Sequence, residues 1–246
     1  MVNSSIDFTS PSVQFTYDLK NNLFFKKDDR NYIDALSINQ LNTLGNASLL
    51  DIYLTTGNVV EPHIHQNASE LVYCISGGAV VSIMNPYTNQ MLNFTIGPGQ
   101  VANVPQGWWH YEMATTDHTH LLAIFDANTP EVIFGSQMLR LTPASVLAHT
   151  YCLDEAKIKE ALAPITSNVV IGPPRGCQQG GRGSMTSSAY PYQPYYGQSS
   201  GPYPYYDVAH VQQAQPPYGY QPAPPSQPPF QQQPACQQPP TYQWYY

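Results

Sequence analysis

The chain has 246 residues, including 24 prolines and 19 tyrosines, and only 10% of its residues are charged, against about 25% in an ordinary globular domain. Its formal net charge of −7 argues against binding to nucleic acid or to an anionic membrane through a basic surface. No apolar run reaches the roughly 18 residues that a membrane-spanning helix needs. We therefore expect neither a nucleic-acid partner nor a membrane partner.

The composition changes near residue 172. The last 74 residues hold 16 of the 24 prolines and 12 of the 19 tyrosines, and their charged residues are Arg175, Arg182 and Asp207. We expect three parts: an N-terminal arm (1–45), a compact domain (46–172) and a disordered Pro/Tyr/Gln-rich tail (173–246) with local polyproline II structure. The first ten residues have neither a basic nor an apolar stretch, so we expect no signal peptide and synthesis in the cytoplasm.

The predicted elements begin in the arm, where a strand is expected at Val13–Tyr17 and a charged turn at 26–30. From residue 47 onward, short apolar runs alternate with Gly, Pro and Asn turns. The expected strands cover 48–56, 70–76, 79–84, 91–96, 100–105 and 120–126. Several short strands at regular spacing are typical of an all-β sandwich or barrel.

The hydrophobic period changes after the last strand. Thr142 followed by Pro143 is a typical helix start, and it predicts a short helix at 144–149. Asp154 can cap a second helix at 154–162, in which Ile158, Ala161 and Leu162 form an apolar stripe. The sequence therefore predicts two short C-terminal helices after the β domain.

The strongest chemical signal is a set of three histidines and one glutamate. His63 and His65 share one face of a strand, because side chains in a strand repeat every two residues. Glu70 opens the next expected strand, so a hairpin would bring its carboxylate over both imidazoles, and His110 would come from a later strand. Three imidazoles and a carboxylate suit a divalent first-row metal, with two of six octahedral positions left open.

These residues also allow other interpretations. The segment from His63 to His65 could be a surface strand, with His110 an ordinary packed histidine. His118 and His120 form a second His-x-His, but no carboxylate follows at ligand spacing, so we expect loop and strand-edge residues there. Glu112 can share the face of His110, where we expect it to be solvated or to support a ligand rather than to bind metal.

Two motifs carry a family resemblance. Gly57, His63, His65, Glu70 and Gly77 have the spacing of the first motif of the cupin superfamily, and Gly99, Pro105, Gly107 and His110 have that of the second. Ala114 stands where the second motif ends in asparagine. The resemblance, to single-domain germin-like and oxalate decarboxylase-like cupins, extends to about residue 172. It implies a cupin β-barrel (a jelly-roll double-stranded β-helix) in which His63, His65, Glu70 and His110 hold Mn²⁺, with Fe²⁺ as the alternative.

The same resemblance implies a metal-dependent oxidoreductase or decarboxylase that acts on a small carboxylate such as oxalate. Two departures count against oxalate. Val60 stands where oxalate decarboxylases have an arginine, and the segment 127–132 differs from their Ser-Glu-Asn-Ser lid. Glu131 is the acid available in that segment, so it is the candidate catalytic proton donor, with an ordinary loop acid as the alternative.

The tail suggests a second function. Its tyrosines and glutamines offer stacking, hydrogen bonding and cross-linking, and its composition resembles that of bacterial spore-coat and surface-assembly proteins. Two hypotheses follow. Either the barrel is a metalloenzyme that the tail attaches to an assembly, or the whole chain is a non-catalytic coat component. In both, we expect a homo-oligomer, because such barrels expose an apolar sheet face.

Overall fold

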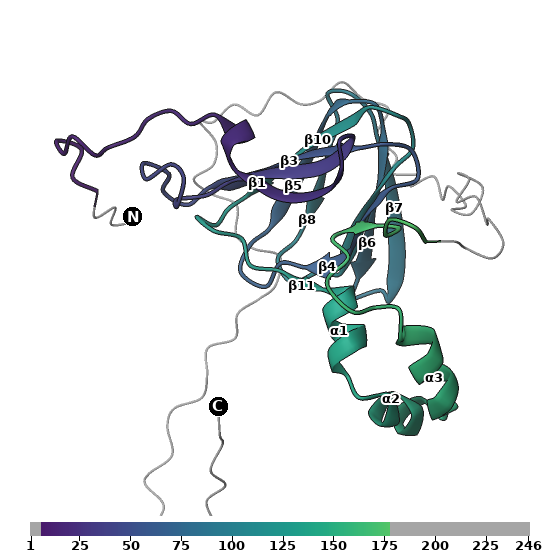
Figure 1. Ribbon diagram of the computed structural model, residues 1–246. Coiled ribbons are helices and arrows are strands. Elements are labelled where there is room, and N and C mark those ends of the chain that lie inside the picture. Colours follow the sequence, from purple (N-terminus) through teal and green to yellow (C-terminus); the bar gives the residue numbers. More distant parts are fainter. Residues whose placement is uncertain (1–5, 178–246) are drawn as a thin grey trace, which may run out of the picture. The chain divides into compact units, whose positions relative to one another are not determined.

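The computed structural model describes residues 6–177, and these form two antiparallel β-sheets followed by three short helices (Figure 1). The predicted all-β jelly-roll barrel is confirmed. The part of the expected tail that spans 178–246 lies outside the described residues.

The first sheet has six strands in the order β1-β2-β3-β10-β5-β8. Their bounds are β1 Leu23–Asp28, β2 Asn31–Leu36, β3 Ser48–Leu54, β10 Thr119–Phe125, β5 Glu70–Ser76 and β8 Val101–Val104. The second sheet has the order β11-β4-β9-β6-β7, and β12 also pairs with β4. Their bounds are β11 Ile133–Phe134, β4 Val59–Ile64, β9 His110–Ala114, β6 Ala79–Asn85, β7 Gln90–Ile96 and β12 Ile171–Gly172.

The core lies between the inner faces of the two sheets. Alternate residues of each strand point inward, so Val72 of β5 and Leu121 and Phe125 of β10 meet Val81 and Ile83 of β6 in one buried cluster. Each of these side chains is at most 3% exposed. This packed interior holds the strands in the register that places the polar residues described below.

The N-terminal region differs from expectation. The predicted strand at Val13–Tyr17 is wrong: the segment pairs with no strand in the described part of the chain, and the Asn42 side chain binds its backbone at Gln14 instead. The strands of this region are β1 and β2, preceded by a single 3₁₀ turn, η1 Leu19–Asn21. They extend the first sheet beyond β3, because Ile33 of β2 is buried in the core.

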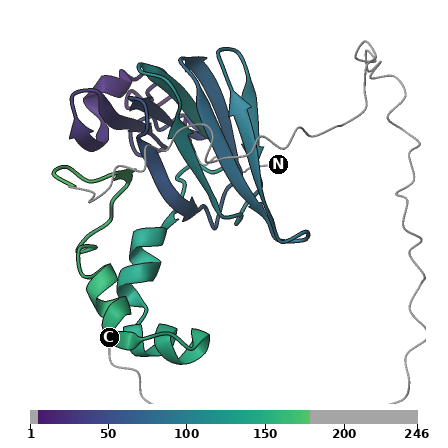
Figure 2. The same cartoon turned by 90° about the vertical axis from the view of Figure 1, so that its right-hand side faces the viewer.

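Three helices follow the barrel, where the sequence predicted two. α2 Ala144–Tyr151 and α3 Glu155–Leu162 match the prediction, and the Asp154 side chain accepts hydrogen bonds from the first turn of α3. The unpredicted helix is α1 Gly135–Leu141. Figure 2 shows the helices projecting from one end of the barrel. Within residues 6–177, no helix has the length and apolar character needed to cross a bilayer.

Helix α1 was missed because its N-terminus is capped from far away in the chain. The residue before the helix is Phe134, which has no side chain that can accept a hydrogen bond. The Glu61 carboxylate of β4 instead accepts from the backbone N–H of Ser136 at 2.9 Å, and from its hydroxyl at 2.9 Å. The Gln137 side chain also accepts from the Phe134 backbone N–H at 2.9 Å, but the cap supplied across 75 residues leaves no local sequence signal.

Candidate metal centre

The structure brings His63, His65, Glu70 and His110 together inside the barrel. His63 is in β4 and His65 follows it, while Glu70 and His110 are the first residues of β5 and β9. In the sheet, His63 pairs directly with His110 across β4 and β9. One ligand atom from each of the four side chains lies within 4.8 Å of all the others, and all four residues are buried.

Each imidazole is held by a hydrogen bond on its Nδ1 side to a backbone carbonyl. His63 Nδ1 donates to Glu61 at 2.6 Å, His65 Nδ1 donates to Glu131 at 2.8 Å, and His110 Nδ1 donates to Trp108 at 2.9 Å. Because a carbonyl oxygen can only accept, these contacts fix the proton on Nδ1. All three Nε2 atoms therefore turn toward the cluster, which is the arrangement that orients metal-binding histidines.

His63 and His65 meet in a way that fits a bound cation. Their Nε2 atoms are 3.1 Å apart. Burial lowers the pKa of both rings below the usual 6.5, and the neighbouring His110 lowers that of His63 further, so both are neutral. Two unprotonated Nε2 lone pairs at this distance repel each other, and a metal ion between them would remove that repulsion.

Glu70 and His110 form an ion pair within the cluster. Glu70 Oε2 is 2.8 Å from His110 Nε2 and 3.5 Å from His65 Nε2. Burial alone would raise the pKa of Glu70, but the hydrogen bond and charge of His110 lower it to about 2. Burial likewise opposes protonation of His110, but Glu70 outweighs it and raises the pKa of His110 to about 9. The proton on His110 Nε2 therefore occupies the place of a metal ion.

Glu112 is a fully buried carboxyl group behind His110. Its Oε1 atom is 3.7 Å from His110 Nε2, and neither of its oxygens has a hydrogen-bond partner among the residues that the structure describes. Burial and then the charge of Glu70 raise its pKa to about 8. The sequence placed Glu112 on the face of His110, and the structure shows that it is shielded from solvent, with 1% of its surface exposed.

Glu61 supports the site from outside the cluster. Besides capping α1, its carboxylate accepts from the backbone N–H groups of Val169 at 2.9 Å and Val170 at 2.7 Å. The same residue's carbonyl receives the Nδ1 proton of His63. No local sequence pattern predicts this role, because the partners of the Glu61 carboxylate lie more than 70 residues away.

Glu131, the candidate proton donor, has its carboxylate in an exposed position. The carboxylate accepts from the Gln66 amide at 2.9 Å, and the Glu131 backbone N–H donates to Asn67 Oδ1 at 2.8 Å. Its contact with the cluster is the backbone carbonyl that receives the Nδ1 proton of His65. In this conformation, Glu131 orients a histidine through its main chain.

A cavity of about 360 Å³ opens onto His63 and His65. Its walls come from β1 to β4, from the segment 129–134 and from Val170. This volume lies within the range of small-molecule sites in proteins. The cluster can therefore be reached by a ligand from the side of these two histidines.

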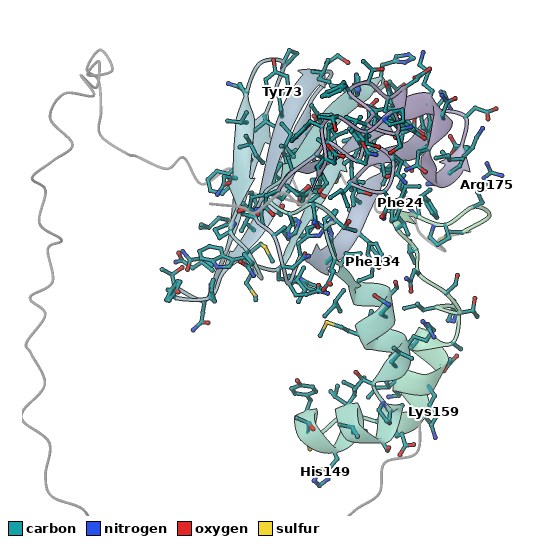
Figure 3. The ribbon with its side chains drawn as sticks, turned by 90° about the vertical axis from the view of Figure 1, so that its left-hand side faces the viewer. Phe24, Tyr73, Phe134, His149, Lys159 and Arg175 are labelled. Carbon is teal, nitrogen blue, oxygen red and sulfur yellow. The ribbon has the colours of Figure 1, made fainter. Side chains whose placement is uncertain are left out.

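The remaining described histidines lie elsewhere. His118 is exposed in the turn before β10, and His120 contacts Asp51 on the outer face of the first sheet. Figure 3 labels His149 at the far end of the helical segment. None of them joins the cluster.

Known proteins share parts of this chain. A germin-like protein of Oryza sativa subsp. japonica is 29% identical over 123 residues, which are 48% of this chain and 54% of that protein. Legumin B of Pisum sativum is 28% identical over 123 residues, which are 50% of this chain and 35% of that protein. The chain thus spans about half or less of the length of these relatives.

Solved structures agree on the fold. The coconut allergen cocosin has a TM-score of 0.57 at 23% identity, covering 63% of this chain and 42% of its own. A recombinant oxalate oxidase in complex with glycolate has a TM-score of 0.55 at 16% identity, covering 62% of this chain and 80% of its own. At such identities the likeness concerns the fold alone. The sequence model described as Cupin matches residues 29–159, more than half of the chain, and so the chain belongs to the cupin family.

Proposed function

We propose that the chain is a mononuclear metal-binding cupin in which His63, His65, Glu70 and His110 hold Mn²⁺, or alternatively Fe²⁺. The observation that carries the proposal is the orientation of the three imidazoles. Each gives its Nδ1 proton to a backbone carbonyl, which leaves every Nε2 atom facing Glu70 and the other rings. Imidazole and carboxylate ligands suit both metals.

A bound divalent metal would supply a Lewis acid, and with Mn or Fe a redox centre, for a small oxygen-donor substrate. The chain's own residues would bind the metal and orient its ligands. Glu70 provides one negative charge, and the carbonyls of Glu61, Trp108 and Glu131 fix the rings. The cavity beside His63 and His65 gives a substrate its approach.

Metal content tests this proposal directly. The full-length chain should bind about one Mn²⁺ or Fe²⁺ per molecule, measured by elemental analysis after dialysis and by electron paramagnetic resonance of the manganese form. His63→Ala and His110→Ala should lose that metal, and His149→Ala, an exposed histidine on α2, is the matched control. Wild-type protein that stays metal-free after supplementation with either ion would contradict the assignment.

Oxidation or decarboxylation of a small carboxylate is the enzymatic form of this proposal. It is favoured by the fold likeness to oxalate oxidase and to an oxalate decarboxylase of Bacillus subtilis (TM-score 0.55, 21% identity). Turnover of oxalate and glycolate by the metal-loaded chain, with and without dioxygen, is the assay. Glu131 as proton donor predicts that Glu131→Gln abolishes turnover while metal content is unchanged.

The second candidate is a non-catalytic assembly component, attached to a spore coat or another surface assembly through residues 173–246. It is favoured by apolar side chains that the helices expose and that a second copy of the chain could cover: Met138, Leu139, Leu141, Val146 and Tyr151. A full complement of metal without turnover, together with loss of assembly on deletion of 173–246, would support it. Unchanged localisation of the deleted chain, or a strictly monomeric protein, would count against it.

A further inference from the structure

The cavity beside the metal cluster has mostly carbon walls. His63 and His65 contribute to its lining, whereas Glu70 and His110 do not. Its apolar lining comes from several separate segments of the chain and includes Phe24, Leu36, Leu50, Val60, Val132 and Phe134. In Figure 3, Phe134 lies where α1 leaves the barrel, with Phe24 on the wall above it.

The lining of the cavity, in the part of the chain that the structure describes, offers no charged side chain that could pair with a charged ligand. In residues 6–177, no lysine, arginine, aspartate or glutamate contributes to its lining. Apart from His63 and His65, its polar side chains are the neutral groups of Asn22, Ser37, Gln40 and Thr129. A ligand charge buried among these side chains would therefore lose its water without gaining an ion pair, which is strongly unfavourable.

The charge of the metal cluster determines which head group a ligand needs. A divalent ion with the single carboxylate of Glu70 keeps one positive charge, which one anionic or strongly polar head group can satisfy. A dicarboxylate brings a second charge for which the apolar walls near Val60 and Leu50 offer nothing.

We propose that this pocket binds a small molecule with one metal-binding oxygen head group and an uncharged, mostly apolar body. The inference rests on the proposed metal site and narrows its substrate class. The head group would reach the metal between His63 and His65, and the body would lie along Val60, Leu50 and Phe134. Oxalate, which has no apolar body, would be a poor ligand.

A series of alkyl hydroxamates tests the apolar body, because the metal-binding head group stays constant while the chain lengthens. Acetohydroxamate, butanohydroxamate, hexanohydroxamate and octanohydroxamate are titrated by calorimetry into the full-length, manganese-loaded chain. The dissociation constant should fall about two- to fourfold for each added methylene, as burial of a methylene predicts. Equal affinity across the series would overturn the proposal.

The requirement for an uncharged body has its own matched pair. Succinic acid monohydroxamate is butanohydroxamate with a carboxylate at the far end, so the two differ in charge at similar length. The charged compound should bind at least about tenfold more weakly. Thr129→Arg, which adds a cation at an exposed position of the lining, should reduce that difference. Equal binding of the two compounds to the wild type would contradict the proposal.

Two variants separate the pocket from general damage to the fold. Phe24 is 50% exposed, so Phe24→Ser should fold, and it should flatten the dependence of hydroxamate affinity on chain length. The same substitution at Phe94, which lies on β7 and does not line the cavity, should leave the dependence of affinity on chain length intact. If metal analysis finds no bound metal, the proposed function fails and this inference fails with it. If metal is bound but chain length has no effect, the substrate class alone is wrong.

Discussion

The two His-x-His segments of this chain have the same spacing but opposite environments. His63 and His65 point into the barrel, give their Nδ1 protons to carbonyls and turn their Nε2 lone pairs toward each other. His118 lies in an exposed turn with a φ of 57°, and His120 points to the outer face of the first sheet. There its Nε2 atom is 2.5 Å from Asp51 Oδ1, and its ring stacks on Tyr53 at 4.2 Å.

The difference shows what makes such a pair a ligand set. The carboxylate beside His120 accepts the Nε2 proton, so that nitrogen is a donor and cannot bind metal at the same time. At His63 the carbonyl of Glu61 accepts a hydrogen bond from Nδ1–H, which leaves Nε2 unprotonated and free to accept. The second hydrogen bond of each ring therefore decides its role, more than the spacing of the histidines.

The largest expected effect is on metal binding. His63→Ala should abolish stoichiometric metal binding, with an affinity loss greater than the roughly 100-fold upper range seen when only a supporting residue is removed. His120→Ala should leave metal content unchanged. Elemental analysis of both full-length variants makes the measurement, and equal metal loss in the two would refute the distinction between the segments.

The next effect concerns Glu112 in the metal-free protein. Its pKa is raised to about 8, so the folded state keeps a proton that the unfolded chain loses above about pH 4.5. The free energy of unfolding should therefore fall as pH rises from 5 to 8. Glu112→Gln should remove this loss, which is on the order of 4 kcal/mol by pH 8.5. Urea unfolding in the presence of a chelator measures it, and a constant difference between the two proteins at all pH values would contradict it.

The third effect is the pH dependence of metal affinity. The pKa of His110 is about 9, so metal must displace its Nε2 proton at any lower pH. Apparent affinity should rise about tenfold per pH unit between pH 7 and 8.5, with close to one proton released. Calorimetry in buffers of different ionisation enthalpy counts that proton. Affinity that does not change with pH would show that His110 is already neutral.

The smallest effect is expected for the contact between His120 and Asp51 on the outer face of the first sheet. His120 and Asp51 are partly exposed, so removing their contact should cost no more than about 1 kcal/mol of stability. His120→Ala should lower the thermal midpoint slightly, by comparison with the wild type in the same buffer. A large loss would mean that the stack of Tyr32, Tyr53 and His120 stabilises the first sheet more than its exposure suggests.

The spacing of glycine, histidine and glutamate was enough to predict that four side chains meet. His63 and His65 had to share a face, and Glu70 had to return through a hairpin, because strand geometry fixes both. The backbone carbonyls that orient the rings could not be predicted, since they depend on how the turn at Trp108 and the segment at Glu131 fold against the barrel. The role of Glu131 as proton donor stays a prediction.

The missed elements share one cause. Helix α1 takes its cap from Glu61, and the hairpin of β1 and β2 is held by pairing with β3 rather than by a strong local pattern. Leu23 and Phe24 of β1 are half exposed, so the usual alternation of buried and exposed residues is absent there. Interactions between distant segments stabilise these elements. Local sequence patterns therefore do not predict them.

Glu61 connects the candidate metal centre to the C-terminal end of the barrel domain through hydrogen bonds. One residue anchors α1 and the 169–170 segment through its side chain and holds the His63 ring through its main chain. A force or a binding event that pulls residue 170 out of place would release a buried carboxylate two positions from a ligand. The C-terminal segment and one imidazole of the cluster therefore share a single point of attachment, Glu61.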